Sequence, residues 1–230
     1  MGIRINKYLS QFGFTSRREA DKLILDGRVT VNNKIIQPGY KVQENEIVKV
    51  DGEKIKSNLK KNIYMAFNKP KGIVCTTDTE KEENNIIDYI NYNKRIFPIG
   101  RLDKLSEGLI LLTNDGDIVN KILRSRYKNE KEYLVTVNKK ISKDFLKKLE
   151  NGVPILNTTT RKCKTTLIND FQFKIILTQG LNRQIRRMCE YFDFRVKKLE
   201  RIRIINIKLG VPIGKWRYLS QEEIKFLKNL

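Results

Sequence analysis

The chain has 230 residues, of which 40% are hydrophobic, and its 47 Lys and Arg against 26 Asp and Glu give a formal net charge of +21. This length and apolar content can build a core, which excludes a disordered tail, and the positive charge favours a polyanion such as RNA, DNA or an anionic membrane. The absence of histidine excludes Ser-His-Asp and Cys-His catalysis and every His-liganded metal site.

Cofactor, metal and membrane signals are absent from the sequence. The three cysteines are far apart and form no CxxC pair, and neither a GxxxxGK[ST] loop nor a GxGxxG motif occurs. The apolar stretch 108–112 is too short to cross a membrane, and MGIRINKYLS has no apolar core of a signal peptide. We therefore expect a cytoplasmic protein with no cofactor, no metal and no membrane partner.

Two helices are predicted at the start of the chain. Ser16 and Glu19 fit a capping box and Gly27 fits a helix stop, so a helix is expected over residues 17–25. Ahead of it, apolar residues at spacings of four and three predict a shorter helix. The basic residues gather at the first helix and at both ends of the second, where they predict one basic face: Arg4, Lys7, Arg17, Arg18, Lys22 and Arg28.

Short antiparallel strands are predicted next. Apolar and polar residues alternate at 29–31 and 47–50, and turn signals lie at 32–33, 38–39 and 51–52. The run RINKYLSQFGFTSRREADKLILDGRVTVNNKIIQPGYKV resembles the S4 RNA-binding domain over its whole length. That resemblance implies binding of structured RNA through shape and phosphates.

The chain is expected to divide into an S4-like domain at 1–56, a polar linker at 57–62 and a larger domain at 63–230. In the larger domain, helices and strands intermix with few regular strand–helix–strand alternations, which favours an α+β fold with an antiparallel or mixed sheet. Strands are expected at 64–67, 108–113, 132–137, 164–168, 171–177 and 196–209. Helices are expected near 86–92, 117–124, 142–150, 182–192 and 220–229.

Two loops of the larger domain carry candidate functional residues. NKPKG, residues 68–72, places Lys69 and Lys71 in a turn, where they are candidates for RNA contact or members of an ordinary basic turn. GRLDKLSEGL places Asp103 on a loop, either as a turn former or as a carboxylate nucleophile. A carboxylate needs no base to activate it, because with an ordinary pKa of about 3.9 it is already ionised at pH 7.

A third stretch, GLNRQIRRMCEYF, predicts a helix with one apolar face that includes Ile185. Arg183, Arg186 and Arg187 lie near its start, where positive charge opposes the helix dipole. A bound phosphate or a partner carboxylate offsets that cost, and solvated arginines are the alternative.

Together these stretches closely resemble the pseudouridine synthases of the RsuA/RluB/RluE/RluF group, through GRLD-x-x-S-x-GL above all. EKEYLVTV, GVPIL, QGLNRQIRRMCE and VKKLERIRI look most like the RluF branch, which acts on large-subunit ribosomal RNA. The resemblance implies that Asp103 is the catalytic nucleophile, that Tyr133 stacks on the target uracil and that Arg186 pairs with the aspartate. It also implies that Arg101 holds the RNA around the extruded base and that Ile185 lines the pocket.

The activity implied is the isomerisation of a specific uridine to pseudouridine in ribosomal RNA, expected to be 23S rRNA, by a monomer without cofactors. Whether tRNA is also a substrate, and whether the aspartate attacks uracil C6 or ribose C1′, stays open. Two alternatives are a non-catalytic S4-type RNA-binding or ribosome-assembly protein and an S4-bearing RNA methyltransferase. The second is disfavoured, since no glycine-rich cofactor loop follows a strand.

Overall fold

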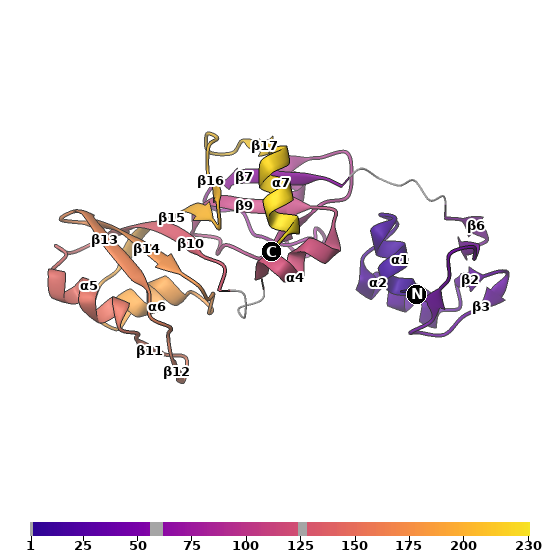
Figure 1. Cartoon of the computed structure of the whole chain (residues 1–230), viewed down its shortest axis with the longest axis horizontal. Helices are drawn as coiled ribbons and strands as arrows, with labels where there is room; N and C mark the ends of the chain where they lie inside the picture. Colours follow the sequence, from indigo (N-terminus) through magenta and orange to yellow (C-terminus); the bar gives the residue numbers. More distant parts are fainter. Residues whose placement is uncertain (1, 56–61, 124–127) are drawn as a thin grey trace. The chain divides into compact units, whose positions relative to one another are not determined.

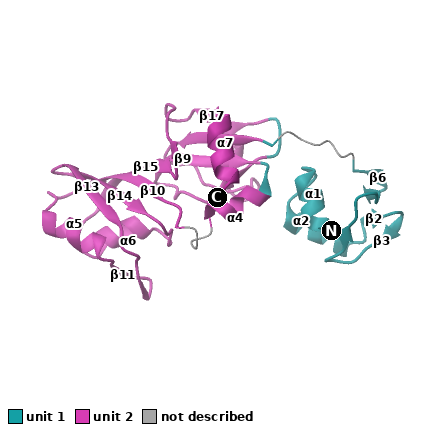
Figure 2. Ribbon diagram, viewed as in Figure 1, with its two compact units in different colours: residues 1–62, 93–95, 114–116 teal, residues 63–92, 96–113, 117–230 magenta. Residues whose placement is uncertain are grey.

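The computed structural model describes residues 2–55, 62–123 and 128–230, so the expected linker, apart from Asn62, lies outside the described residues. Two compact units are present (Figure 2). The first contains residues 1–62 with the short segments 93–95 and 114–116, and the second contains the rest of the chain. Among the described residues, no helix has the length and apolar composition that crossing a membrane requires.

The first unit packs two helices on short strands (Figure 1). The helices are α1 (Ile5–Gln11) and α2 (Arg17–Leu25), and the strands are β1 (Ile3–Arg4), β2 (Val29–Val31), β3 (Lys34–Ile35), β4 (Lys41–Val42), β5 (Val48–Val50) and β6 (Glu53–Lys54). The Ser16 hydroxyl accepts from the backbone N–H of Glu19 at 3.1 Å and so caps α2, and Gly27 follows the helix with a φ of +69°. The helices and strands expected here are therefore present.

The second unit is built on one nine-stranded sheet in the order β13-β14-β10-β15-β9-β7-β17, with β8 paired to β9 and β16 to β15. Its strands are β7 (Tyr64–Lys69), β8 (Phe97–Ile99), β9 (Glu107–Thr113), β10 (Lys131–Val137), β13 (Lys164–Asn169), β14 (Gln172–Leu177), β15 (Val196–Ile204), β16 (Ile207–Lys208) and β17 (Trp216–Tyr218). A separate hairpin pairs β11 (Pro154–Ile155) with β12 (Thr158–Thr159).

The helices of this unit are α3 (Ile86–Ile90), α4 (Gly116–Leu123), α5 (Lys143–Glu150), α6 (Gln184–Glu190) and α7 (Gln221–Lys228). Every strand pair of the large sheet is antiparallel except β9 with β15, which run parallel over two residue pairs. The expected α+β class with an antiparallel or mixed sheet is therefore confirmed.

The central strands β7 and β9 are buried on both faces. Leu109 and Leu111 of β9 pack toward the core formed with α4 and α7, whereas Ile110 and Leu112 pack toward the core formed with α3. Burial on both faces explains why the run GLILLT is continuously apolar rather than alternating. Because this strand begins directly after the GRLD loop, its burial anchors the loop at one end.

The strand expected at 196–209 is two strands, β15 and β16. Ile205 lies between them with a φ of +56°, and its N–H donates to the carbonyl of Glu130. A left-handed residue ends an extended run, so the chain turns back on itself here. Alternation alone did not predict this turn, because Ile205 is a β-branched residue that is rare in such a conformation.

Candidate active site

The loop that carries Asp103 connects β8 to β9 and is held by both of its ends. Leu102 is buried in the core on the α3 side, and its N–H donates to the Sγ of Cys75 at 3.4 Å. The carbonyl of Asp103 accepts from the Ser106 N–H at 3.0 Å, and the carbonyl of Lys104 accepts from the Gly72 N–H at 2.8 Å. The backbone around position 103 is therefore fixed by the core, by a turn and by the neighbouring NKPKG loop.

The side chain of Asp103 is half-buried, and among the described residues it makes no hydrogen bond and no ion pair. Glu107, the other acid of the motif, differs, because Lys198 lies 2.7 Å from its carboxylate. Asp103 is thus the carboxylate of this loop that stays available to an incoming molecule.

Arg186 lies against the same loop, but the expected ion pair with Asp103 is not formed within the described residues. Its guanidinium donates instead to the carbonyls of Leu105 at 3.1 Å and Val196 at 3.2 Å, and to the hydroxyl of Ser106 at 3.4 Å. Burial lowers the pKa of Arg186, and the nearby charge of Asp103 acts in the opposite direction. Backbone carbonyls therefore accept the hydrogen bonds that were expected to go to Asp103. Arg186 holds the loop in place and interacts with Asp103 through the electrostatic attraction between their charges.

Lys69 has no exposed surface, which does not agree with the expected role as an RNA contact. Its ammonium donates to the carbonyls of Pro70 and Ile73 at 2.8 Å each and so closes the NKPKG turn from inside. Burial lowers the pKa of Lys69, and the carboxylate of Asp103 partly offsets this effect. Lys71 of the same turn is exposed.

A cavity of about 340 Å³ opens beside Asp103, in the size range of small-ligand sites. The predicted residues that line it are Arg101, Asp103, Tyr133, Arg183 and Ile185. A second hollow of about 960 Å³ shares residues 100–103, 180–181 and 183 with it. The structure therefore brings Asp103, Tyr133 and Ile185 to one cavity, with two exposed arginines in its wall.

Two positively charged residues of this cavity were not identified from the sequence. Lys131 and Arg201 both line it, and burial together with the charge of Arg201 lowers the pKa of Lys131 to about 8. Both residues belong to strands in which charged and apolar residues alternate, KEYLV and LERIRI. Alternation shows that some of these charges face inward, but it does not tell which.

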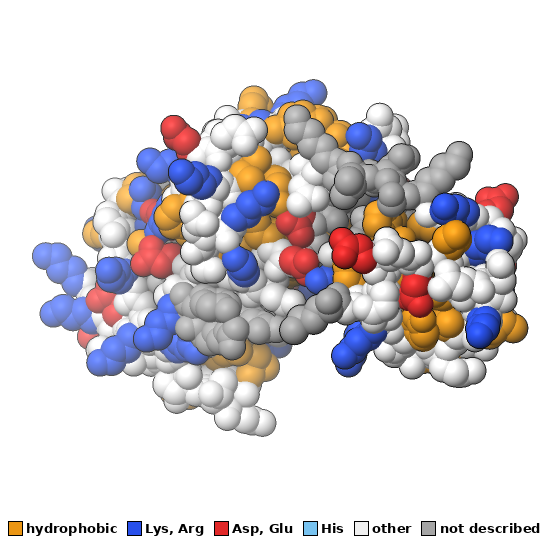
Figure 3. Space-filling view, turned by 45° about the vertical axis from the view of Figure 1, so that its right-hand side comes forward, with side chains coloured by type: hydrophobic (Ala, Val, Ile, Leu, Met, Phe, Trp, Pro, Cys, Tyr) orange, Lys and Arg blue, Asp and Glu red, His pale blue; other side chains and the backbone are white. Residues whose placement is uncertain are grey.

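The remaining predicted residues lie outside the cavity lining. Arg187 donates to the carbonyl and the side chain of Asn182. In the first unit, Arg28 forms a two-bond ion pair with Asp51 at 2.6 and 2.8 Å, whereas Arg4, Arg17, Arg18 and Lys22 are exposed. Figure 3 shows Lys and Arg side chains scattered over the visible face of the molecule rather than confined to one patch.

Thiol chemistry is not supported by the surroundings of two cysteines. Burial raises the pKa of Cys189 and of Cys163 to about 12 in each case, so both remain protonated at neutral pH. No three His, Cys, Asp or Glu side chains in the described ranges are grouped as metal ligands.

Comparison with known proteins gives two family matches. Residues 63–191 match the RNA pseudouridylate synthase family, and residues 3–48 match the S4 domain. The cavity lies in the segment covered by the first match, apart from the contributions of Leu199, Arg201 and Ile204.

Three similar proteins cover almost the whole chain. The dual-specificity RNA pseudouridine synthase RluF of Escherichia coli is 53% identical over 96% of this chain and 77% of its own length. The ribosomal large subunit pseudouridine synthase B of Bacillus subtilis is 34% identical over 99% of this chain and 96% of its own length. A crystal structure of a pseudouridylate synthase aligns with a TM-score of 0.70 at 25% identity, covering 98% of this chain and 99% of the other.

Proposed function

Because the chain belongs to the RNA pseudouridylate synthase family, we propose that it isomerises a specific uridine of ribosomal RNA to pseudouridine with Asp103 as the nucleophile. One observation carries the assignment: Asp103, a carboxylate without a side-chain partner among the described residues, lies in the wall of a cavity shared with Tyr133 and Ile185. An ionised carboxylate attacks without a base, which suits a chain without histidine.

In the proposed reaction, the N1–C1′ bond of the uridine breaks, the uracil turns, and C5 bonds to C1′. A base within a helix cannot reach the cavity, so the target nucleotide has to be flipped out at a cost of a few kcal/mol. Stacking of the base on Tyr133, worth roughly 1 to 3 kcal/mol, offsets that cost. Arg101 and Arg183, both exposed at the cavity wall, are positioned to contact RNA phosphates around the extruded nucleotide.

Arg186 and Lys69 act on the nucleophile through the backbone that carries it. Arg186 donates a hydrogen bond to the carbonyl of Leu105. Lys69 closes the turn from which the Gly72 N–H donates to the carbonyl of Lys104. Since a small displacement of a reacting group costs a large factor in rate, we assign both as positioning residues.

The S4-like unit is proposed to hold structured RNA while the second unit carries out the reaction. Arg4, Arg17 and Arg18 are exposed and positioned to contact phosphates, as is Lys22 beside its exposed ion-pair partner Glu19, and Lys7 belongs to the same basic face. Arg28 contributes less, because Asp51 already neutralises it.

The RNA class rests on the relatives. The Bacillus relative is named for the ribosomal large subunit, and the Escherichia relative is named for a dual specificity. We therefore propose large-subunit ribosomal RNA as the substrate of a cytoplasmic monomer, and transfer RNA is the second class to examine.

Mapping pseudouridines in ribosomal and transfer RNA from cells with and without the gene tests this proposal. At least one ribosomal site should disappear with the gene, return with the wild-type gene, and stay absent with Asp103→Asn. The Asn side chain has almost the same shape but cannot attack, so RNA affinity of this variant should stay within about threefold. An unchanged map would instead favour a non-catalytic RNA-binding role, and a wild-type map with Asp103→Asn would remove Asp103 from the mechanism.

A further inference from the structure

An irregularity in β15 turns two nearby arginines to opposite faces of the sheet. In the pairing with β10, Glu132 lies opposite Arg203 and Tyr133 lies opposite Arg201, so Ile202 is an extra residue on β15. Such a bulge re-aims side chains and is frequent beside active sites. Arg201 therefore shares the cavity face with Tyr133, and Arg203 shares the opposite face with Glu132.

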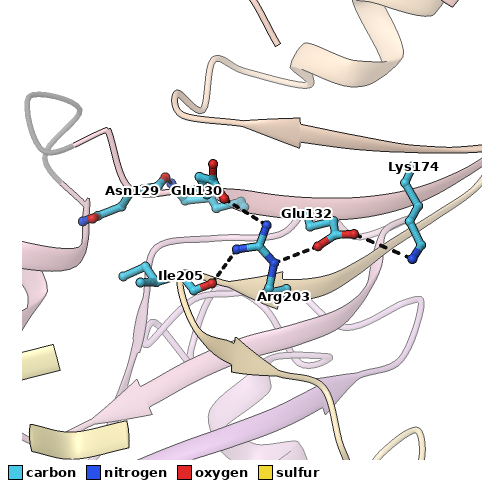
Figure 4. Close-up of polar contacts among 7 residues, drawn as sticks. Asn129, Glu130, Glu132, Lys174, Arg203 and Ile205 are labelled. Atoms are coloured by element: carbon cyan, nitrogen blue, oxygen red, sulfur yellow. Dashed lines mark hydrogen bonds and ion pairs between the residues drawn. The ribbon is translucent and has the colours of Figure 1, made fainter. Parts of the chain in front are cut away.

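On the opposite face, Arg203 is fully engaged (Figure 4). Its guanidinium bonds Glu132 at 2.7 Å, Glu130 at 3.0 Å and the carbonyl of Ile205. Lys174 lies 3.8 Å from the same Glu132. Although burial opposes it, the hydrogen bonds to these two glutamates raise the pKa of Arg203. Arg203 thus has every partner that a structural arginine requires.

Arg201 is only 3% exposed, yet it lacks such partners. Its Nε donates to the carbonyl of Leu109 at 2.6 Å, which fixes the plane of the guanidinium. Its Nη2 is buried without a hydrogen-bond partner, and Nη1 also makes no hydrogen bond within the described residues. Leaving a buried charged donor unpaired is costly, so such a group is expected to have an acceptor in the working complex.

The cavity supplies a second cation and almost no negative charge. Lys131 lies two residues before Tyr133 on β10, so both side chains stand on the cavity face. Among the described residues, its ammonium donates to the carbonyl of Asn129 at 3.4 Å and to no other acceptor. Asp103 is the one carboxylate among the described lining residues. Arg201 and Lys131, together with the exposed Arg101 and Arg183, make the wall of the cavity strongly positive, which favours a ligand that brings oxygen acceptors.

We propose that Arg201, assisted by Lys131, donates hydrogen bonds to the carbonyl oxygens of the flipped uracil and stabilises the negative charge that the base carries during the reaction. The inference rests on the proposed function and names two further groups that touch the substrate. Since Arg201 lies opposite Tyr133 across the strand pair, its donors lie beside the edge of a base stacked on that ring. A cytosine presents an amino group at C4 in place of the oxygen and fits this arrangement less well.

The charge follows from the bonds that change. When N1–C1′ breaks, the electron pair remains on uracil N1 and spreads over the oxygens at C2 and C4. Bonding of C5 to C1′ then consumes an electron pair of the ring, and the bond between Asp103 and the nucleoside breaks, which returns the carboxylate. C5 loses its proton, and N1 gains one. No oxidant or reductant is required. Donors aimed at oxygens whose charge grows in this way accelerate the reaction more than they tighten binding.

Single-turnover kinetics on matched RNA hairpins test the proposal, with the target uracil carrying oxygen or with sulfur replacing the oxygen at C2 or at C4. Sulfur is a weaker acceptor, so at least one sulfur RNA should react roughly tenfold more slowly with the wild type. Arg201→Met should slow the oxygen RNA about 100-fold with little change in RNA affinity, as removal of an oxyanion donor does. In this variant the sulfur effect should shrink to within about twofold, because the contact is already lost.

Controls separate this role from folding and from the proposed function. Arg203→Met removes an arginine two residues away on the opposite face and should leave the rate of the folded enzyme within about threefold. If Arg201→Met does not fold, two milder variants take its place in the same kinetic comparison. Arg201→Lys keeps a cation at the position, and Lys131→Met leaves the hydrogen bond from Arg201 to the carbonyl of Leu109 intact. A wild type that forms no pseudouridine defeats the proposed function itself. An active wild type with no sulfur effect, or with the same effect in Arg201→Met, overturns only the present inference.

Discussion

The two faces of the β10–β15 strand pair carry the same kinds of charged residue in different surroundings. On one face, Arg203 is surrounded by two glutamates and a carbonyl (Figure 4). On the other face, Arg201 and Lys131 line a cavity and find only backbone carbonyls. The first arrangement is complete without a ligand, and the second is complete only when acceptors enter. The partners of a charged residue, rather than its burial, therefore distinguish a structural role from a functional one.

The cavity face depends on the close approach of β9 to β15, and Gly108 permits it. A Cβ at this position would lie 2.4 Å from the carbonyl oxygen of Arg201, and the φ of +101° is unfavourable for any side chain. We expect Gly108→Ala to cost about 3 kcal/mol of folding free energy, because neither backbone can yield. Urea unfolding measures it, with Gly116→Ala, which has open space and ordinary φ, as control. Equal stability of the two variants would mean that the strands separate without cost.

The face of the β10–β15 pair that carries Arg203 should contribute to folding stability but not to the rate of pseudouridine formation. Arg203→Met leaves Glu132 and Glu130 without their main partner, so a loss of roughly 2 to 3 kcal/mol in unfolding free energy is expected. The pseudouridine-forming rate of the folded fraction should stay near the wild-type value. A rate loss as large as that of Arg201→Met would erase the distinction between the faces.

Lys131, on the cavity face, should also affect how the folding stability depends on pH. The pKa of Lys131 falls to about 8 in the folded state, whereas its ordinary value is 10.5, through burial and Arg201. Besides Lys131 and Arg201, the titratable groups that line the cavity are Arg101, Asp103, Tyr133 and Arg183. Between pH 8 and 10.5 the unfolded chain binds more protons at this lysine, so its effect on stability becomes more favourable as pH rises.

Comparing the wild type with Lys131→Met isolates that contribution from the other lysines. From pH 7 to pH 10, the wild type should gain on the order of 1 kcal/mol relative to the variant. Parallel stability curves for the two proteins would show that Lys131 keeps an ordinary pKa.

Local rules predicted the elements of the first unit and the position of the loop that carries Asp103. The cap at Ser16, the stop at Gly27 and the apolar run after Asp103 each act over a few residues, so the sequence alone was sufficient. The sequence alone could not predict that Arg201 of β15 faces the cavity, because the bulge at Ile202 depends on pairing with β10. Burial of Lys69, whose strand β7 pairs with β9, and the contact of Arg186 with the carbonyl of Leu105 likewise arise between segments distant in the chain.

A structure of the Asp103→Asn variant with an RNA hairpin that contains the target uridine would show whether a flipped base occupies the cavity beside position 103. We expect a flipped uridine whose uracil stacks on Tyr133 and whose carbonyl oxygens face Arg201 and Lys131. Its C6 or C1′ should lie about 3.5 Å from the side chain at position 103. A hairpin bound with the target base still stacked in its helix, and the cavity holding no nucleotide, would contradict this expectation.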